Sequence, residues 1–255
     1  MTAGAMPLVS MRGVVKTFAN GTEALAGLDL DVREGEFLSL LGPSGCGKST
    51  ALRLIAGLGD VSGGRIAWRD GARPEIGFVF QEPTLMPWAS VASNVFLPLR
   101  LKGASRREAD WRVREALEGV GLSAFADAYP RELSGGMRMR VSIARALVTR
   151  PPLLLMDEPF AALDEITRFR LNDDLLSLSA RLRTTVIFVT HSVFESVYLS
   201  SRIAVFSARP GRVAETIEID GPPVRTPDFR HSAAFSEFGR RVSAALDAAS
   251  GAQAA

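Results

Sequence analysis

The chain has 255 residues, of which 47% are apolar, and its formal net charge at neutral pH is +2. This length and apolar content are enough to bury a full core in one large domain, which excludes a disordered chain. The small net charge excludes the strong field that proteins with nucleic acid or an anionic membrane as their main partner carry.

The chain has one cysteine, Cys46. A single cysteine excludes an internal disulfide and a cysteine-rich zinc site, and it suits a reducing compartment. No apolar run approaches the roughly 18 to 20 residues of a transmembrane helix, and the N-terminus lacks the pattern of a signal peptide. We therefore expect a soluble, cytoplasmic protein.

The N-terminal part of the chain, up to residue 32, is predicted to contain two strands. Residues 8–14 and 26–32 alternate apolar and polar side chains, which predicts a half-exposed antiparallel sheet. A loop over residues 16–21 separates these two strands. Its Phe18 is either a small core residue or an exposed platform on which a base stacks, and the residues alone slightly favour the core.

The segment GPSGCGKST at 42–50 follows an apolar strand, 37–41, and opens a helix. This is the pattern of a phosphate-binding loop, in which bare backbone N–H groups wrap an anion at the positive end of a helix. Lys48 would reach the β- and γ-phosphates, and the Ser49 hydroxyl would ligate Mg²⁺. The same position at a helix N-terminus predicts a lowered pKa for the Cys46 thiol. The alternative to phosphate binding is a glycine-rich turn with a structural role only. The expected nucleotide-binding residues of the loop are Gly42, Ser44, Gly45, Cys46, Gly47, Lys48, Ser49 and Thr50.

The helix after this loop should end at Gly57, and strands are predicted at 65–68 and 76–80. The second of these strands ends on Gln81. A polar amide there is usually a boundary residue, but at the carboxyl end of a strand it can also offer an oxygen to a metal or a water.

From residue 85 onward the pattern changes from strand to helix. Ser90 is the predicted N-cap of a helix over 91–101, kinked at Pro98, and a capping box at 105–108 opens a second helix. We expect an inserted helical subdomain over residues 84–135. It begins with the apolar cluster at 85–88, which includes Trp88 and is either local core or a docking surface.

The turn LSGGM at 133–137 precedes another helix with one apolar face. Ser134 is at least an N-cap, and the two glycines behind it leave backbone amides uncovered at a helix N-terminus. Uncovered amides at a helix N-terminus can bind an anion. Taken alone, however, this turn is only weak evidence for ligand binding.

Two further buried strands are predicted, and both end in polar residues. The strand 153–156 runs into Asp157 and Glu158, and the strand 185–190 runs into His191. Each could be an ordinary strand exit. In a parallel sheet, however, these residues and Gln81 would share one edge beside the phosphate loop, where Mg²⁺ needs hard oxygen ligands. A hairpin over 203–219 and a helix over 232–248 complete the chain, followed by a tail, 249–255, that we expect to fray.

The chain contains six motifs whose order and spacing are typical of one family. They are GPSGCGKST at 42–50, FQEP at 80–83, LSGGM at 133–137, LLLMDEP at 153–159, ALD at 162–164 and TH at 190–191. The chain resembles the nucleotide-binding subunit of ABC transporters, in particular the importer branch that handles nitrate, aliphatic sulfonates, taurine and related solutes. The resemblance implies an α/β fold with a P-loop NTPase core, in which a mixed central sheet has flanking helices. It also implies an N-terminal antiparallel β subdomain and an inserted α-helical subdomain. A single ATPase domain would span 1–255, with a short C-terminal helical extension at 220–255.

The resemblance also implies roles for particular residues in ATP hydrolysis. Glu158 would be the general base, and His191, Lys48 and Gln81 would complete the catalytic set. Ser49, Gln81 and Asp157 would bind Mg²⁺. Phe18 would stack on adenine, Asp164 would link two active sites, and Ser134 with Gly136 would bind the γ-phosphate of ATP held by a second copy of the chain.

The partners implied are a second copy in an ATP-sandwich homodimer, integral membrane permease subunits and, indirectly, an extracytoplasmic solute-binding protein, without nucleic acid. The protein would sit peripherally on the cytoplasmic face of the plasma membrane.

One departure from the family pattern is Met137, which stands where the broad family usually has Gln, so a polar contact to the facing nucleotide is in doubt. Two rivals are a small-molecule kinase, which the 133–137 turn does not support, and a nucleic-acid-associated ABC ATPase. The second would need tandem domains or a long coiled coil.

Overall fold

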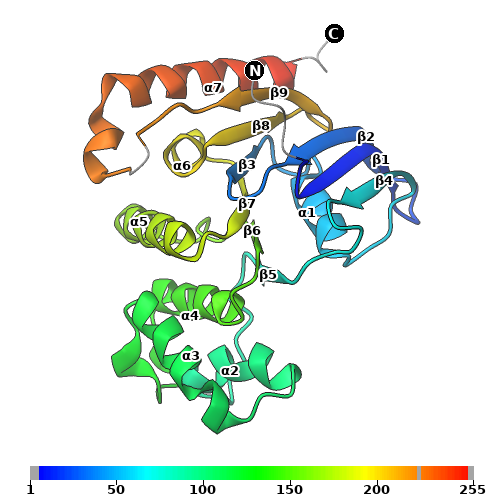
Figure 1. Ribbon diagram of the computed structural model, residues 1–255. Coiled ribbons are helices and arrows are strands. Elements are labelled where there is room, and N and C mark those ends of the chain that lie inside the picture. Colours follow the sequence, from blue (N-terminus) through cyan, green and yellow to red (C-terminus); the bar gives the residue numbers. More distant parts are fainter. Residues whose placement is uncertain (1–5, 223–224, 252–255) are drawn as a thin grey trace. The chain divides into compact units, whose positions relative to one another are not determined.

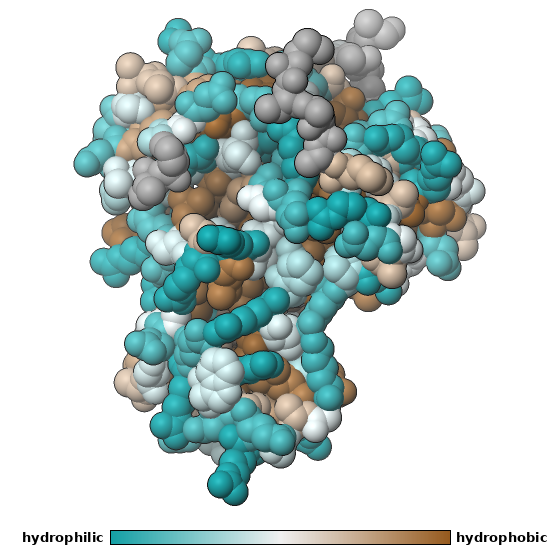
Figure 2. Space-filling model, in the orientation of Figure 1, coloured by the Kyte–Doolittle hydropathy of each residue, from teal (hydrophilic) through white to brown (hydrophobic). Residues whose placement is uncertain are grey.

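The computed structural model describes residues 6–222 and 225–251, which form two compact units (Figure 1). The first unit contains the described residues up to 74 and from 185 onward, and the second contains residues 75–184. Within the described ranges, no helix combines the length and the apolar character that a membrane crossing requires. Figure 2 shows a surface on which hydrophilic residues predominate, with hydrophobic residues between them.

The N-terminal strands form a three-stranded antiparallel sheet in the order β2-β1-β4. Its strands are β1 (Val9–Thr17), β2 (Glu23–Val32) and β4 (Gly63–Trp68). The predicted alternation is confirmed, because Leu28, Leu30 and Val32 are buried while Asp29 is exposed. One face of β2 therefore supplies core.

A second sheet of the first unit contains β3 (Phe37–Leu41), β7 (Thr185–Thr190), β8 (Arg202–Phe206) and β9 (Val213–Glu218). The order is β7-β3-β8-β9, with β7, β3 and β8 parallel and β9 antiparallel to β8. Every residue of β3 is buried, as expected for a strand apolar on both faces. The hairpin predicted near the C-terminus is the β8–β9 pair.

Three helices belong to this unit: α1 (Lys48–Ala56), α6 (Val193–Leu199) and α7 (Ala233–Gly251). Gly57 ends α1 with a left-handed φ of 70°, as predicted. Helix α6 packs on β3 and β7, and α7 packs on α6, β8 and β9 after a short turn, η3 (Pro227–His231). The ring centroid of Phe235 lies 4.6 Å from that of Phe194 and 5.4 Å from that of Phe229. These aromatic contacts hold α7 against α6 and η3.

The predicted C-terminal helix is longer than expected. It continues through residues 249–251, which the sequence assigned to a frayed tail, because Ala249 is buried against the unit. The rest of that tail lies outside the described residues.

The second unit pairs β5 (Ile76–Val79) in parallel with β6 (Leu153–Asp157) and also contains four α-helices. These are α2 (Val91–Leu101), α3 (Arg106–Gly119), α4 (Gly135–Leu147) and α5 (Glu165–Leu182), with short turns η1 (Ser123–Phe125) and η2 (Pro130–Glu132). The N-cap at Ser90 and the capping box of Ser105 with Glu108 are confirmed. Helix α5 was not predicted from the sequence.

Helix α4 approaches β5 closely because β5 carries a glycine at the crossing. A Cβ on Gly77 would lie 2.6 Å from the carbonyl oxygen of Ala146. The buried side of α4 includes Val141, Ala144 and Leu147, which belong to the apolar face expected of this helix.

Candidate functional site

The phosphate-loop segment connects the end of β3 to the start of α1. Gly45 and Gly47 adopt left-handed φ values of 74° and 105°, which favour glycine. Gly47 occupies the N-cap position of α1 and offers no side-chain cap. The first N–H groups of α1 therefore face a loop of bare backbone, which is the arrangement that binds phosphate.

Lys48 places a positive charge inside this loop. Its side chain is buried, and Nζ donates to the carbonyl oxygens of Gly42 at 2.6 Å and Pro43 at 2.8 Å. A buried ammonium beside the positive end of α1 makes the loop strongly favourable for an anion.

Close packing beneath the loop explains two of its glycines. A Cβ on Gly42 would lie 2.9 Å from Cβ of Phe206, and a Cβ on Gly47 would lie 2.6 Å from the carbonyl oxygen of Ala24. Both positions exclude any side chain. The glycines of this loop therefore have a packing role in addition to the proposed phosphate binding.

The expected activation of Cys46 is wrong. The thiol is buried, and this burial raises the pKa of Cys46, although the nearby Lys48 ammonium partly offsets the effect. Sequence reasoning counted the helix N-terminus but not the desolvation of the thiolate, which here is the larger contribution.

Phe18 lies at the end of β1 and is 46% exposed, so the core reading that the residues slightly favoured is wrong for this chain. A local turn holds it, since its N–H donates to the carbonyl of Thr22 and its own carbonyl accepts from Gly21. The Lys16 ammonium lies 5.7 Å from the ring centroid. An exposed ring beside a cation is suited to stacking on a nucleotide base.

His191 emerges at the same edge as the phosphate loop. In the parallel β3–β7 pair Leu41 is opposite Thr190, so Gly42 and His191 follow neighbouring strands. His191 is exposed, and the next turn is fixed by Ser192, whose N–H donates to Oγ1 of Thr190 at 3.0 Å. The strand pairing agrees with the expectation that His191 leaves its strand at the same sheet edge as the phosphate loop.

In the second unit, side chains that carry amide and carboxylate oxygens follow two paired strands in the same way. In the parallel β5–β6 pair Val79 is opposite Met156, so Gln81 and the Asp157–Glu158 pair leave the strands at one edge. Asp157 is buried and ends β6. Glu158 has a φ of 45°, which is strained for a residue with a side chain and costs on the order of 1 to 3 kcal/mol. Such strain is typical of functional positions.

The 133–137 turn and the 162–164 motif form two adjacent helix starts. Ser134 caps α4 by accepting from Met137 N–H at 3.3 Å, and Asp164 caps α5 by accepting from Thr167 N–H at 2.9 Å. This hydrogen bond lowers the pKa of Asp164. A Cβ on Gly136 would lie 2.7 Å from Cγ2 of Thr167, so the glycine lets α4 approach α5.

The predicted site residues therefore form two groups. Phe18, the phosphate loop and His191 lie in the first unit. Gln81, Ser134, Gly136, Asp157, Glu158 and Asp164 lie in the second.

The proposed Mg²⁺ ligands suit that ion. A Ser49 hydroxyl, a Gln81 amide and an Asp157 carboxylate are hard oxygen donors, and Mg²⁺ commonly takes only one or two protein ligands beside substrate phosphates. The described residues contain no group of three or more His, Cys, Asp or Glu side chains that could hold a metal by itself. Each of these three donor types therefore suits a nucleotide-bound Mg²⁺.

Sequence reasoning missed the residues that hold the loop after Gln81. The buried Asn94 side chain in α2 accepts from the N–H of Met86 at 2.7 Å and donates to the carbonyls of Met86, Ala89 and Ser90 at 3.1 to 3.2 Å. Trp88 lies on this loop and is 77% exposed. The loop is thus ordered from within while its largest apolar side chain points outward.

A second attachment comes from α4. Arg145 donates to the carbonyl oxygens of Thr84 and Pro83 at 2.9 and 2.8 Å, and Thr84 has a φ of 47°. The loop after Gln81 is therefore attached to the helix that begins at Ser134. No local sequence signal indicates this contact, because its partners are 61 and 62 residues apart.

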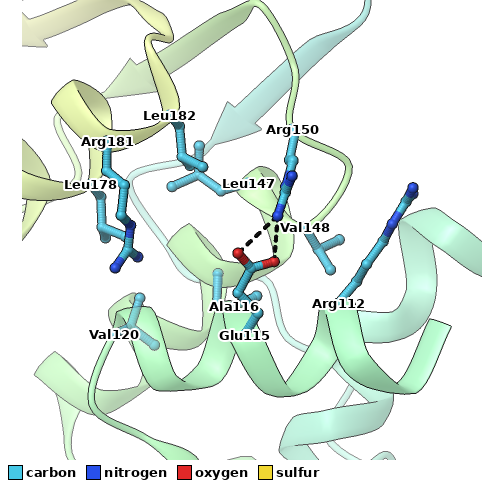
Figure 3. A pocket seen from close by; sticks show the side chains of 11 residues that line it. Arg112, Glu115, Ala116, Val120, Leu147, Val148, Arg150, Leu178, Arg181 and Leu182 are labelled. Carbon is cyan, nitrogen blue, oxygen red and sulfur yellow. Dashed lines mark hydrogen bonds and ion pairs between the residues drawn. The ribbon is translucent and has the colours of Figure 1, made fainter.

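An open pocket lies among α3, α4 and α5 (Figure 3). Its walls are largely apolar, and at its rim Arg150 donates to both carboxylate oxygens of Glu115 at 2.8 and 2.6 Å. None of the predicted site residues lines it. This pocket is therefore distinct from the candidate site.

Comparison with known proteins gives matches over most of the chain. The model of the family described as "ABC transporter" matches residues 25–161. An aliphatic sulfonates import ATP-binding protein, SsuB 1 of Pseudomonas syringae pv. syringae, is 48% identical over 212 residues, covering 83% of this chain and 86% of the relative. An aliphatic sulfonates import ATP-binding protein SsuB of Bacillus cereus is 42% identical over 242 residues, covering 92% and 94%.

Among solved structures, the chain is similar to the dimeric post-hydrolysis state of the ATP-binding cassette MJ0796 bound to ADP and Pi. The TM-score is 0.75 at 34% sequence identity, with 84% of this chain and all of that chain covered. The predicted fold class is confirmed by this likeness.

Proposed function

The chain belongs to the ABC transporter family and is an ATPase of the ATP-binding cassette type, and from this premise we propose that it powers a membrane permease importing a small anionic solute. The solute class is nitrate, an aliphatic sulfonate, taurine or a similar molecule. The identity of 48% with an aliphatic sulfonate import protein supports this class. The chain would act peripherally at the cytoplasmic face of the membrane, with an extracytoplasmic solute-binding protein delivering the solute to the permease.

The catalytic roles follow from the two groups of residues. Lys48 and the N–H groups of the phosphate loop bind the β- and γ-phosphates, and Phe18 stacks on the base. Glu158 accepts a proton from the attacking water, which Gln81 helps to position, and His191 contacts the γ-phosphate. Bound Mg²⁺, held by Ser49, Gln81 and Asp157, would neutralise charge on the phosphates.

A homodimer completes this assignment. Ser134 and Gly136 lie at the N-terminus of α4, whose positive end suits the γ-phosphate of ATP bound to a second copy, and Asp164 would connect the two sites. ATP would then stabilise the closed dimer, and hydrolysis would release it. These two states can drive a permease because ATP binds only one of them well.

The observation that carries the transport role is the exposure of Trp88 in an ordered loop. A tryptophan with 77% of its surface exposed contributes little to the core of this chain. Yet the Asn94 and Arg145 hydrogen bonds fix the loop beneath it, so the side chain is presented in a defined place. We assign this loop, residues 85–88, to permease docking.

Replacing Trp88 by alanine tests the docking role. A core tryptophan would cost about 3 to 5 kcal/mol on truncation, whereas we expect the melting temperature and basal ATPase of W88A to stay near wild type. Co-purification with the permease and solute-stimulated hydrolysis should be lost. The matched control is W111A, since Trp111 is also exposed, at 53%, but lies in α3. A destabilised W88A that still binds the permease contradicts the proposal.

The solute is tested in the reconstituted complex with its binding protein. Nitrate, taurine, alkanesulfonates and pyrimidine thiamine precursors are compared for stimulation of ATP hydrolysis. Stimulation by one of the first three classes is the expected result. Stimulation only by the pyrimidines or an unrelated solute rejects the proposed class without affecting the docking result.

A further inference from the structure

The turn between β8 and β9, residues 207–212, packs against the phosphate loop. The N–H of Gly211 donates to the carbonyl of Ala24 at 2.9 Å, and the Gly211 carbonyl accepts from Ala26 N–H at 3.3 Å. These bonds attach the turn to β2. On the side of the phosphate loop, a Cβ on Gly211 would lie 2.1 Å from the carbonyl oxygen of Cys46. Only glycine permits this approach.

Arg209, in the same turn, reaches the preceding peptide of the loop. Its Nε donates to the carbonyl oxygen of Gly45 at 3.1 Å. The turn thus contacts two successive loop carbonyls, those of Gly45 and Cys46. All of these residues belong to the first unit.

The Gly45 carbonyl and the Cys46 N–H belong to one planar peptide group and point in opposite directions across it. A guanidinium that holds the carbonyl therefore also fixes the direction of the N–H. A charged donor on the oxygen polarises the peptide, which strengthens the N–H as a donor. That N–H donates a long hydrogen bond, 3.4 Å, to the Pro43 carbonyl.

We propose that Arg209 is a positioning residue of the phosphate loop: it holds the Gly45 carbonyl, directs the Cys46 N–H toward bound nucleotide phosphates and adds a cation beside the anion site. Gly211 is required because it lets the turn approach. The inference rests on the nucleotide binding assigned above and extends it to a turn that none of the six sequence motifs includes.

The first test measures the Kd for MgATP and MgADP with the full chain. Arg209→Gln should weaken both by about three- to tenfold, where tenfold corresponds to about 1.4 kcal/mol. Arg209→Lys, which keeps the charge and one donor, should lie between wild type and R209Q. Arg212→Gln is the matched control, because Arg212 is exposed in the same turn and its loss changes the net charge equally. Equal affinities of R209Q and R212Q would overturn the proposal.

The second test needs no nucleotide. Cys46 is buried and is the only cysteine, so its labelling by a maleimide reports opening of the phosphate loop alone. R209Q should label several-fold faster than wild type, while R212Q should not. An unchanged rate in R209Q contradicts the positioning role. If instead the wild-type chain fails to bind ATP, the proposed function is wrong while the labelling result still decides the role of Arg209 in the loop.

Discussion

Arg145 in α4 donates to both the carbonyl oxygen and the hydroxyl oxygen of Thr84, at 2.9 and 3.0 Å. Thr84 lies three residues after Gln81 and four before Trp88. The contact therefore connects the helix of the 133–137 turn with the loop that carries a proposed catalytic amide and the proposed docking side chain. Burial also lowers the pKa of Arg145, because desolvation disfavours the charged guanidinium.

Removing this contact should loosen the loop. Arg145→Met keeps most of the side chain's packing but removes the donor to the loop's oxygens, and each lost hydrogen bond is worth about 0.5 to 1.5 kcal/mol. We expect faster amide exchange over 81–89 and about tenfold less solute-stimulated ATPase, while the ATP Kd stays near wild type.

The control for this variant is Arg114→Met, which removes an exposed arginine paired with Asp110 on α3. It should leave the exchange of 81–89 unchanged. Wild-type exchange in R145M would show that the loop is held by other contacts, Asn94 foremost.

Two neighbouring glycines at the start of α4 give a matched pair. A Cβ on Gly136 would meet Cγ2 of Thr167 at 2.7 Å, whereas a Cβ on Gly135 meets its nearest atom, in Leu163, at an ordinary 3.7 Å. Both changes to alanine gain helix propensity, so their difference isolates the contact with α5. Relative to G135A, G136A should be less stable by about 1 to 3 kcal/mol.

Urea unfolding measures that difference. Equal stabilities of the two variants would mean that α4 and α5 separate without cost, and the role of Gly136 would then be limited to the nucleotide.

Most strands and helix starts could be predicted because their signals are local. The burial of β3 follows from five apolar or small residues in a row, and the capping box at Ser105 needs only Glu108 three residues later. Helix α5 was missed, although its buried Leu171, Leu175 and Leu178 have helical spacing. Its exposed Ile166 obscures that stripe.

The phosphate loop, the carboxylates after β6 and the histidine after β7 were also predictable, since each ends an apolar strand. The contacts of Arg145 and Arg209 were not, because they depend on partners 61 to 164 residues away. The pKa of Cys46 could not be predicted for the same reason. Its position at a helix N-terminus was visible in the sequence, but the burial that raises its pKa arises only in the folded unit.

Asp164 combines a capping role with a proposed role between the two active sites, and amide substitution separates them. Asp164→Asn keeps an oxygen that accepts from Thr167 N–H, so thermal stability at neutral pH should fall less than in Asp164→Ala. If Asp164 also communicates across the dimer, D164N should lose cooperativity in ATP hydrolysis while remaining folded. Unchanged cooperativity in D164N would limit Asp164 to capping.

The pH dependence follows from the lowered pKa of the Asp164 carboxyl. Its charged form is favoured in the folded state, so its contribution to stability is present above the ordinary Asp pKa of about 3.9. That contribution disappears as the pH falls through the lowered value. The stability difference between wild type and D164N should therefore shrink on acidification, and a difference that grows would contradict the assignment.

The central claim is that Glu158 is the base for ATP hydrolysis at a site completed by a second chain. The most direct measurement is the turnover and the oligomeric state of Glu158→Gln with MgATP, with Glu118→Gln on the exposed side of α3 as control. E158Q should bind ATP, lose turnover by about two to four orders of magnitude, and elute as an ATP-dependent dimer in size-exclusion chromatography, whereas E118Q should behave as wild type. Near wild-type turnover in E158Q, or a monomer that binds ATP without turning it over, would contradict the account.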